Sequence, residues 1–179
     1  AGGVPVIIQG NQDQAFKITP EQLEAAITEK TKLVVINSPS NPSGKAYTRA
    51  ELAALGNVLL KHPNILIATD DMYEHILWSD EPFSNIVMTC PELYKQTIVL
   101  NGVSKAYSMT GWRIGYAAGP AELIKAMKKI QSQSTSNPTS ISQYAAQAAL
   151  EGDQSCIGEM LVAFKERHDY VVERLNEIE

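Results

Sequence analysis

Short apolar runs alternate along this chain with segments in which apolar residues recur every three or four positions. The short runs predict β-strands at residues 4–8, 32–37, 65–69, 97–101 and 113–118. The run at residues 32–37 is almost continuously apolar, which is typical of a parallel strand buried on both faces.

The longer periodic segments carry helix signals. Thr19-Pro20-Glu21-Gln22 and the pair Thr48 and Glu51 both have the spacing of a capping box, so we expect a helix to start at each. Further helices are predicted after Pro120 to about residue 133, over residues 141–151, and in the C-terminal segment. The last helix has one apolar stripe, interrupted by His168, which we interpret as a packing surface: Ile157, Leu161, Phe164, Val171, Leu175 and Ile178.

Alternation of strands and helices predicts an α/β fold, in which a mainly parallel sheet is flanked by helices in three layers. A chain of 179 residues is long enough for one such domain with a sizeable core. Ligands of parallel sheets bind beyond the carboxyl ends of the strands. The polar residues that follow each strand are therefore the candidates for function.

Composition narrows the class of protein. The net charge of −5 argues against nucleic acid and an anionic membrane surface as partners, and no apolar stretch reaches the length of a membrane span. Cys90 and Cys156 are far apart in the sequence and form no redox or metal motif, which is typical of a reduced, cytoplasmic protein. The histidines are scattered along the chain, so the sequence indicates no metal site. The chain begins without Met and stops inside an amphipathic helix, so we expect a piece of a longer protein.

Three predicted strands end in polar residues that could meet at one ligand. The first is followed by Asn37-Ser-Pro-Ser-Asn41-Pro-Ser-Gly44, the next by Asp70-Asp71-Met72-Tyr73, and the third by Gly102-Val-Ser-Lys105. Each segment alone has an ordinary interpretation as a turn or a helix cap. Their occurrence at three successive strand ends predicts a common site.

Lys105 is the most informative of these residues. A lysine at the end of a buried strand is poorly solvated, which lowers its pKa and lets the amine attack a carbonyl to form a Schiff base. Eight residues later, Arg113 would suit an anionic group such as a phosphate. The combination suggests pyridoxal phosphate (PLP); the alternative is an exposed loop lysine followed by a structural arginine.

The stretches NSPSNPSG, ATDDMYE and NGVSKAYSMTGWRIGYAAGP resemble class I aminotransferases, the aspartate aminotransferase group of fold-type I PLP enzymes. With the spacings between them, the resemblance covers nearly the whole chain. It implies that Lys105 holds PLP covalently and later moves a proton, and that Asp70 pairs with the pyridine nitrogen. It also implies that Tyr73 and Asn41 contact the phenolic oxygen of PLP, that Asn41 borders the substrate carboxylate, and that Arg113 binds the phosphate.

Two positions depart from the family pattern. Many members carry a phosphate-binding Ser or Thr three residues before the lysine, where this chain has Gly102, so Ser104 is the candidate for that contact. Some aspartate aminotransferases carry an arginine shortly before Ser-Asn-Pro, which recognises the distal carboxylate. Here that position is Ser132, which argues against dicarboxylate specificity by this route.

The resemblance implies transamination between an aspartate-like or aromatic/prephenate-like amino acid and a 2-oxo acid such as 2-oxoglutarate, by a homodimer in the full-length protein. It also implies that residues 1–179 are a central part of the PLP-binding large domain, without its N-terminal part and without the small domain. Two strands of a seven-stranded sheet would then be missing, one of them between the first two strands predicted here. The alternatives are a C–S lyase or decarboxylase of the same fold type, a PLP-binding regulatory domain without turnover, and an inert, partly folded fragment.

Overall fold

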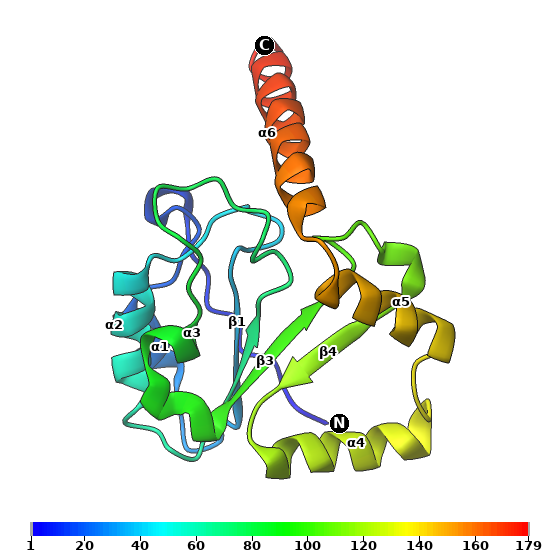
Figure 1. Cartoon of the computed structure of the whole chain (residues 1–179). Helices are drawn as coiled ribbons and strands as arrows, with labels where there is room; N and C mark the ends of the chain where they lie inside the picture. Colours follow the sequence, from blue (N-terminus) through cyan, green and yellow to red (C-terminus); the bar gives the residue numbers. More distant parts are fainter. Residues whose placement is uncertain (1, 179) are drawn as a thin grey trace.

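The computed structural model describes residues 2–178, and its centre is a four-stranded sheet with the strand order β1-β2-β3-β4 (Figure 1). The strands are β1 (Leu33–Asn37), β2 (Leu66–Asp70), β3 (Thr97–Gly102) and β4 (Gly115–Ala118). β1, β2 and β3 are parallel to one another, and β4 is antiparallel to β3. In the register of the sheet, Asn37 lies opposite Asp70, and Asp70 lies opposite Leu100. The predicted mainly parallel α/β sheet is confirmed, and three strand ends lie side by side.

Short helices pack on β1 and β2 to form the main core, and they lie together on one side of the sheet (Figure 1). They are α1 (Pro20–Ala26), α2 (Arg49–Leu59), α3 (Ile86–Thr89) and the 3-10 helix η2 (Pro91–Gln96). Side chains with almost no exposed surface fill the space between them, including Leu23, Leu52, Leu59, Ile67, Ile86 and Leu93. A further 3-10 turn, η1 (Gln12–Gln14), precedes α1.

Both predicted capping boxes are confirmed. The backbone N–H of Gln22 donates to Thr19 Oγ1 over 3.3 Å, and that of Glu51 donates to Thr48 Oγ1 over 3.2 Å. Each pair satisfies backbone donors that would otherwise be free in the first turn of a helix. This local chemistry explains why α1 and α2 begin where the sequence predicts.

The predicted strand at residues 4–8 is not formed. Val4 and Ile7 are 88% and 80% exposed, and the segment is not assigned to any strand. Its apolar composition favours β-structure, but a strand also needs a neighbour for its backbone N–H and C=O groups. Within residues 2–178, no strand pairs with this segment.

β1 is also less buried than its composition predicts. Leu33 and Val35 are 54% and 62% exposed, whereas Ile36 is buried in the core. Alternate residues of a strand face opposite sides of the sheet, so one side of β1 meets the core and the other side is open. The prediction of burial on both faces is wrong because, among the described residues, β1 is an edge strand with helices on one face.

β4 begins later than predicted and runs antiparallel to β3. Residues between β3 and β4 form a turn and the short 3-10 helix η3 (Thr110–Trp112), rather than the crossover helix that a parallel neighbour needs. Arg113 follows η3 with a left-handed backbone conformation, φ 56°, which cannot continue a strand. The predicted strand at 113–118 therefore shortens to Gly115–Ala118, and Arg113 lies in the preceding loop.

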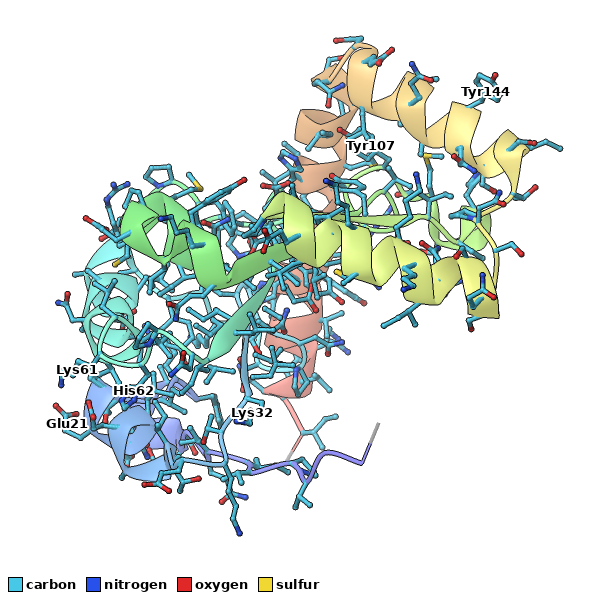
Figure 2. The ribbon with its side chains drawn as sticks, turned by 90° about the horizontal axis from the view of Figure 1, so that it is seen from below. Glu21, Lys32, Lys61, His62, Tyr107 and Tyr144 are labelled. Atoms are coloured by element: carbon cyan, nitrogen blue, oxygen red, sulfur yellow. The ribbon has the colours of Figure 1, made fainter. Side chains whose placement is uncertain are left out.

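Three longer helices complete the described chain: α4 (Ala121–Ser134), α5 (Ser140–Glu151) and α6 (Ser155–Leu175). α5 contributes the buried Ala146 to a small second core, and its Tyr144 points away from the rest of the molecule (Figure 2). None of the described helices has the length and apolar character needed to cross a membrane.

α6 projects away from the sheet (Figure 1). The first part of its apolar stripe, from Ile157 to Phe164, is half-buried, whereas Val171 and Leu175 are exposed. His168 makes an edge-on contact with Trp78, with ring centroids 5.2 Å apart. The interpretation of the whole stripe as a packing surface holds in this structure only for its N-terminal half.

Candidate active site

The loop after β1 is tied to the end of β2 by Asn37. Its Nδ2 donates to the backbone oxygen of Asp70 over 3.1 Å, and its Oδ1 accepts from the backbone N–H of Asn41 over 2.8 Å. Asn41 itself is exposed. Sequence reasoning assigned no role to Asn37, although an amide side chain as the last residue of a strand was a usable signal.

The second strand end presents Asp70 and Tyr73, both half-buried. Asp70 is the last residue of β2, and its Oδ1 accepts from the backbone N–H of Met72 over 3.2 Å. Among the described residues, its Oδ2 accepts no hydrogen bond, so one carboxylate oxygen is available to a ligand.

The third strand end presents Lys105. This half-buried residue lies in the turn after β3, which is held by hydrogen bonds from Ser108 N to Lys105 O and from Met109 N to Val103 O. Lys105 Nζ lies 5.4 Å from the centroid of the Tyr73 ring. The structure therefore brings the lysine of one strand end against the tyrosine of its neighbour.

A side-chain pair fastens these two strand ends to each other. Asn101 Nδ2 donates to Glu74 Oε1 over 2.6 Å, and Asn101 Oδ1 accepts from the backbone N–H of Gly102 over 2.7 Å. Glu74 follows Tyr73 directly, so the pair holds the tyrosine-bearing segment on the strand that leads to Lys105. Sequence reasoning missed this pair because its two members are 27 residues apart.

Ser104 and Arg113 are linked through Thr110. Thr110 Oγ1 donates to Ser104 O over 3.0 Å, and Arg113 Nη1 donates to Thr110 O, also over 3.0 Å. Arg113 is exposed, and among the described residues no hydrogen bond joins it to Lys105. The two candidates for a phosphate thus belong to one loop, next to the turn that carries the lysine.

Gly102 stands where β3 and β4 come very close. A Cβ atom there would lie 2.9 Å from Ile114 O and 3.1 Å from Gly115 Cα, closer than side chains normally approach backbone atoms. A Ser or Thr at this position would need β4 to move. The close packing of β4 therefore explains why this chain has Gly102 where many family members have Ser or Thr.

The two adjacent aspartates have different surroundings. Asp71 is buried, and its carboxylate accepts hydrogen bonds from Thr69 Oγ1 and Asn85 Nδ2, each over 2.6 Å. Burial raises the pKa of Asp71, while these two hydrogen bonds oppose that increase. Asp70, by contrast, is half-buried, and within residues 2–178 its Oδ2 accepts no hydrogen bond.

The arrangement gathers an amine, a carboxylate and a phenol at adjacent strand ends, with a guanidinium in the neighbouring loop. The sequence profile of the family "Aminotransferase class I and II" matches residues 1–179. The chain belongs to the class I and II aminotransferases. Class I aminotransferases of the aspartate aminotransferase type are PLP-dependent.

Curated relatives agree with this family. The chain is 61% identical over 178 residues to an aspartate/prephenate aminotransferase of Nitrosomonas europaea, with 99% of the chain and 45% of the relative covered. It is 52% identical to an aspartate aminotransferase of Bacillus subtilis, again covering 99% of the chain and 45% of the relative. The chain thus spans a little under half the length of these aminotransferases.

Solved structures show the same fold. The crystal structure of the aspartate aminotransferase of Rhizobium meliloti matches with a TM-score of 0.94 and 52% identity, over 97% of this chain and 44% of that one. An aspartate aminotransferase double mutant of Thermus thermophilus matches with a TM-score of 0.90 and 39% identity, over 99% of this chain and 46% of that one. These matches confirm the large-domain fold of PLP-dependent aminotransferases and the resemblance inferred from the three motifs.

Proposed function

We propose that this chain carries the PLP-anchoring part of an aminotransferase, with Lys105 as the residue that attaches the cofactor. The observation that carries the proposal is the position of Lys105 Nζ, 5.4 Å from the Tyr73 ring centroid, beside the strand that ends in Asp70. The match of all 179 residues to the aminotransferase family adds support.

The residues fit the chemical groups of PLP. The free Oδ2 of Asp70 suits a protonated pyridine nitrogen, and donors from Tyr73 and Asn41 suit a phenolic oxygen. Arg113 and Ser104 share one loop, where a guanidinium and a hydroxyl can bind a phosphate. When bound, PLP supplies a ring that accepts electron density from the α-carbon of an amino acid.

Each side chain has a separate task in this proposal. Asp70 holds a proton at the pyridine nitrogen, because an adjacent carboxylate favours the charged form of that nitrogen. Tyr73 and Asn41 orient the ring by donating hydrogen bonds to its phenolic oxygen. Lys105, after release by the incoming amino acid, moves the proton from the substrate α-carbon as a general base and acid.

The substrates that we propose are an amino acid of the aspartate or prephenate-derived type and a 2-oxo acid such as 2-oxoglutarate. The names of the relatives from Nitrosomonas europaea and Bacillus subtilis support this choice. We further propose that residues 1–179 belong to the PLP-binding large domain of a longer protein, which acts as a cytoplasmic homodimer. The coverage of under half of each relative supports the first of these points.

The decisive experiment is an absorbance spectrum of the full-length protein with PLP, before and after addition of aspartate, glutamate or an aromatic amino acid. Transamination predicts that the cofactor band is lost and that one oxo acid forms for each amino acid consumed. Release of pyruvate together with ammonia would instead indicate a C–S lyase. A cofactor band that no amino acid changes would indicate a PLP-binding regulator and contradict the proposal.

A further inference from the structure

Asp71 is a buried acid to which the proposed function gives no task. Its exposed fraction is 1%, and among the described residues no lysine, arginine or histidine forms an ion pair with it. A buried carboxylate without a cation is costly, and it persists where hydrogen bonds compensate the loss of water. The contacts of Asp71 therefore indicate what it does.

Its carboxylate joins the end of β2 to a distant part of the chain. Oδ1 accepts from Thr69 Oγ1 and Oδ2 accepts from Asn85 Nδ2, each over 2.6 Å. Asn85 also caps α3, because its Oδ1 accepts from the backbone N–H of Met88 over 2.8 Å. α3 is itself fixed by Ile86, which is fully buried in the main core.

The backbone of Asp71 is held as firmly as its side chain. Its N–H donates to Leu100 O on β3 over 2.9 Å, and its C=O accepts from the N–H of Glu74, also over 2.9 Å. Asp71 lies just past the end of β2, and its hydrogen bond with Thr69 places these two side chains on the same side of the chain, opposite to the intervening Asp70. Fixing Asp71 toward the core therefore fixes the opposite direction of Asp70, and it fixes the turn that carries Tyr73.

We propose that Asp71 is a positioning residue for the cofactor site. Held between Thr69 and Asn85, it sets the direction in which Asp70 and Tyr73 face PLP. A carboxylate suits this task because it offers an acceptor oxygen to each of the two donors. The proposal rests on the proposed function, since it assigns Asp71 a role toward the same cofactor.

Exchange of the two partners tests the proposal in the full-length protein. Asn85→Asp places two carboxylates face to face, whereas the double variant Asp71→Asn with Asn85→Asp restores an acid–amide pair and keeps an acceptor for Met88 N. We expect Asn85→Asp to weaken PLP binding roughly tenfold and to shift the absorbance band of the bound cofactor, because a buried hydrogen bond is lost. The double variant should recover both properties to within about threefold of the parent.

A second, more conservative pair of variants tests the proposal even if Asn85→Asp unfolds the protein. Thr69→Val removes one hydrogen bond to Asp71 with little change of shape, and Thr69→Ser keeps the hydroxyl. We expect Thr69→Val to weaken PLP binding about threefold or more and Thr69→Ser to restore it. This pair decides the question if Asn85→Asp does not fold, as judged by circular dichroism of the apo-protein.

The readouts distinguish positioning from mere stability. If Thr69→Val and a folded Asn85→Asp bind PLP with the parent affinity and an unshifted absorbance band, Asp71 supports only the fold and the proposal is overturned. A folded double variant that binds PLP no better than Asn85→Asp also overturns it. Failure of the parent protein itself to bind PLP would reject the proposed function, and this proposal with it.

Discussion

At the scale of single residues, the site depends on side chains that come from different strands. These side chains meet where the carboxyl ends of the parallel strands lie side by side. Asp70 ends β2, and Lys105 follows β3, so the parallel register brings them to the same edge. The motifs predict which residues these are. They do not predict the contacts of Asn37 with Asp70, of Asp71 with Asn85, or of Glu74 with Asn101, because each contact joins residues far apart in sequence.

Lys105→Ala should remove the covalent attachment of PLP in the full-length protein and almost all transamination, because no other described lysine contacts the Tyr73 ring. Borohydride reduction followed by peptide mapping checks this: the phosphopyridoxyl label is expected on Lys105 in the parent and nowhere in the variant. The matched control is Lys61→Ala, which changes a surface lysine (Figure 2) and should leave the label in place. Lys61 pairs with Glu24 and, among the described residues, forms no hydrogen bond or ion pair with those of the proposed site. A label on a different lysine would refute the assignment.

Asp70→Asn should leave PLP bound but reduce kcat about a hundredfold or more, because an amide cannot hold the pyridine nitrogen protonated. Single-turnover kinetics with an α-deuterated amino acid measure whether proton removal has become the slow step. Asp80→Asn, a change at an exposed aspartate, is the control. Near-parent turnover of Asp70→Asn would assign the role to another group.

At the scale of elements, local signals and pairing requirements account for different parts of the fold. The capping residues Thr19 and Thr48 are local, so the starts of α1 and α2 follow from the sequence. The segment at residues 4–8 and the open face of β1 were predicted incorrectly, because strand formation and burial depend on neighbours that the pattern of one segment does not specify.

Glu51 links the start of α2 to the segment before α1, since its carboxylate accepts from Thr48 and pairs with Lys17 over 2.6 Å. Burial raises the pKa of Glu51, but the hydrogen bonds from Lys17 and Thr48 outweigh it, so the net pKa is lowered. The charged form is therefore favoured by folding. Its stabilising contribution is complete above about pH 5 and disappears as the pH falls through the lowered folded-state pKa.

Glu51→Gln should accordingly lower the free energy of unfolding by less than about 1 kcal/mol near neutral pH, because the carboxylate is partly exposed. Gln still offers an oxygen to Thr48 N, so the helix cap is kept. Calorimetry of variant and parent between pH 3 and 8 measures the difference, which should shrink toward zero at the acid end. A difference that grows on acidification would contradict the lowered pKa.

Gly102→Ala should destabilise the protein by about 1–3 kcal/mol, because the new Cβ would press against the backbone of β4 at Ile114 and Gly115. Gly111→Ala is a matched control, since a Cβ there meets no atom within 4 Å. Thermal unfolding followed by circular dichroism compares the two. Equal unfolding temperatures for both variants would show that β4 can move to accommodate the new Cβ without loss of stability.

At the scale of the whole molecule, the described chain has two unequal parts. The main core lies between β1, β2 and the short helices, whereas α4 and α6 contain no buried residue. Exposed apolar side chains gather on these helices and on β1, among them Met127, Ile130, Val171, Leu175, Leu33 and Val35. Exposed apolar surface favours association with other protein surfaces.

The 179-residue chain by itself should therefore show less than about 1% of the transaminase activity of the full-length protein, because catalysis requires tight positioning of both cofactor and substrate. It should also associate as its concentration rises. A coupled assay with excess PLP, amino donor and 2-oxoglutarate measures the first property, and size-exclusion chromatography with light scattering measures the second. Robust turnover by a monomeric chain would contradict both expectations.

The order of the strands has a consequence for how the protein is made. Because β1, β2, β3 and β4 are neighbours in the same order in which they occur along the chain, each strand joins the one synthesised just before it. Among the described residues, each strand after β1 finds its partner already synthesised, so the four-stranded sheet can grow by successive addition during translation. The turn that carries Lys105 leaves the ribosome only after β2 and β3. This lysine therefore arrives at the carboxyl ends of the strands when Asp70 is already in place.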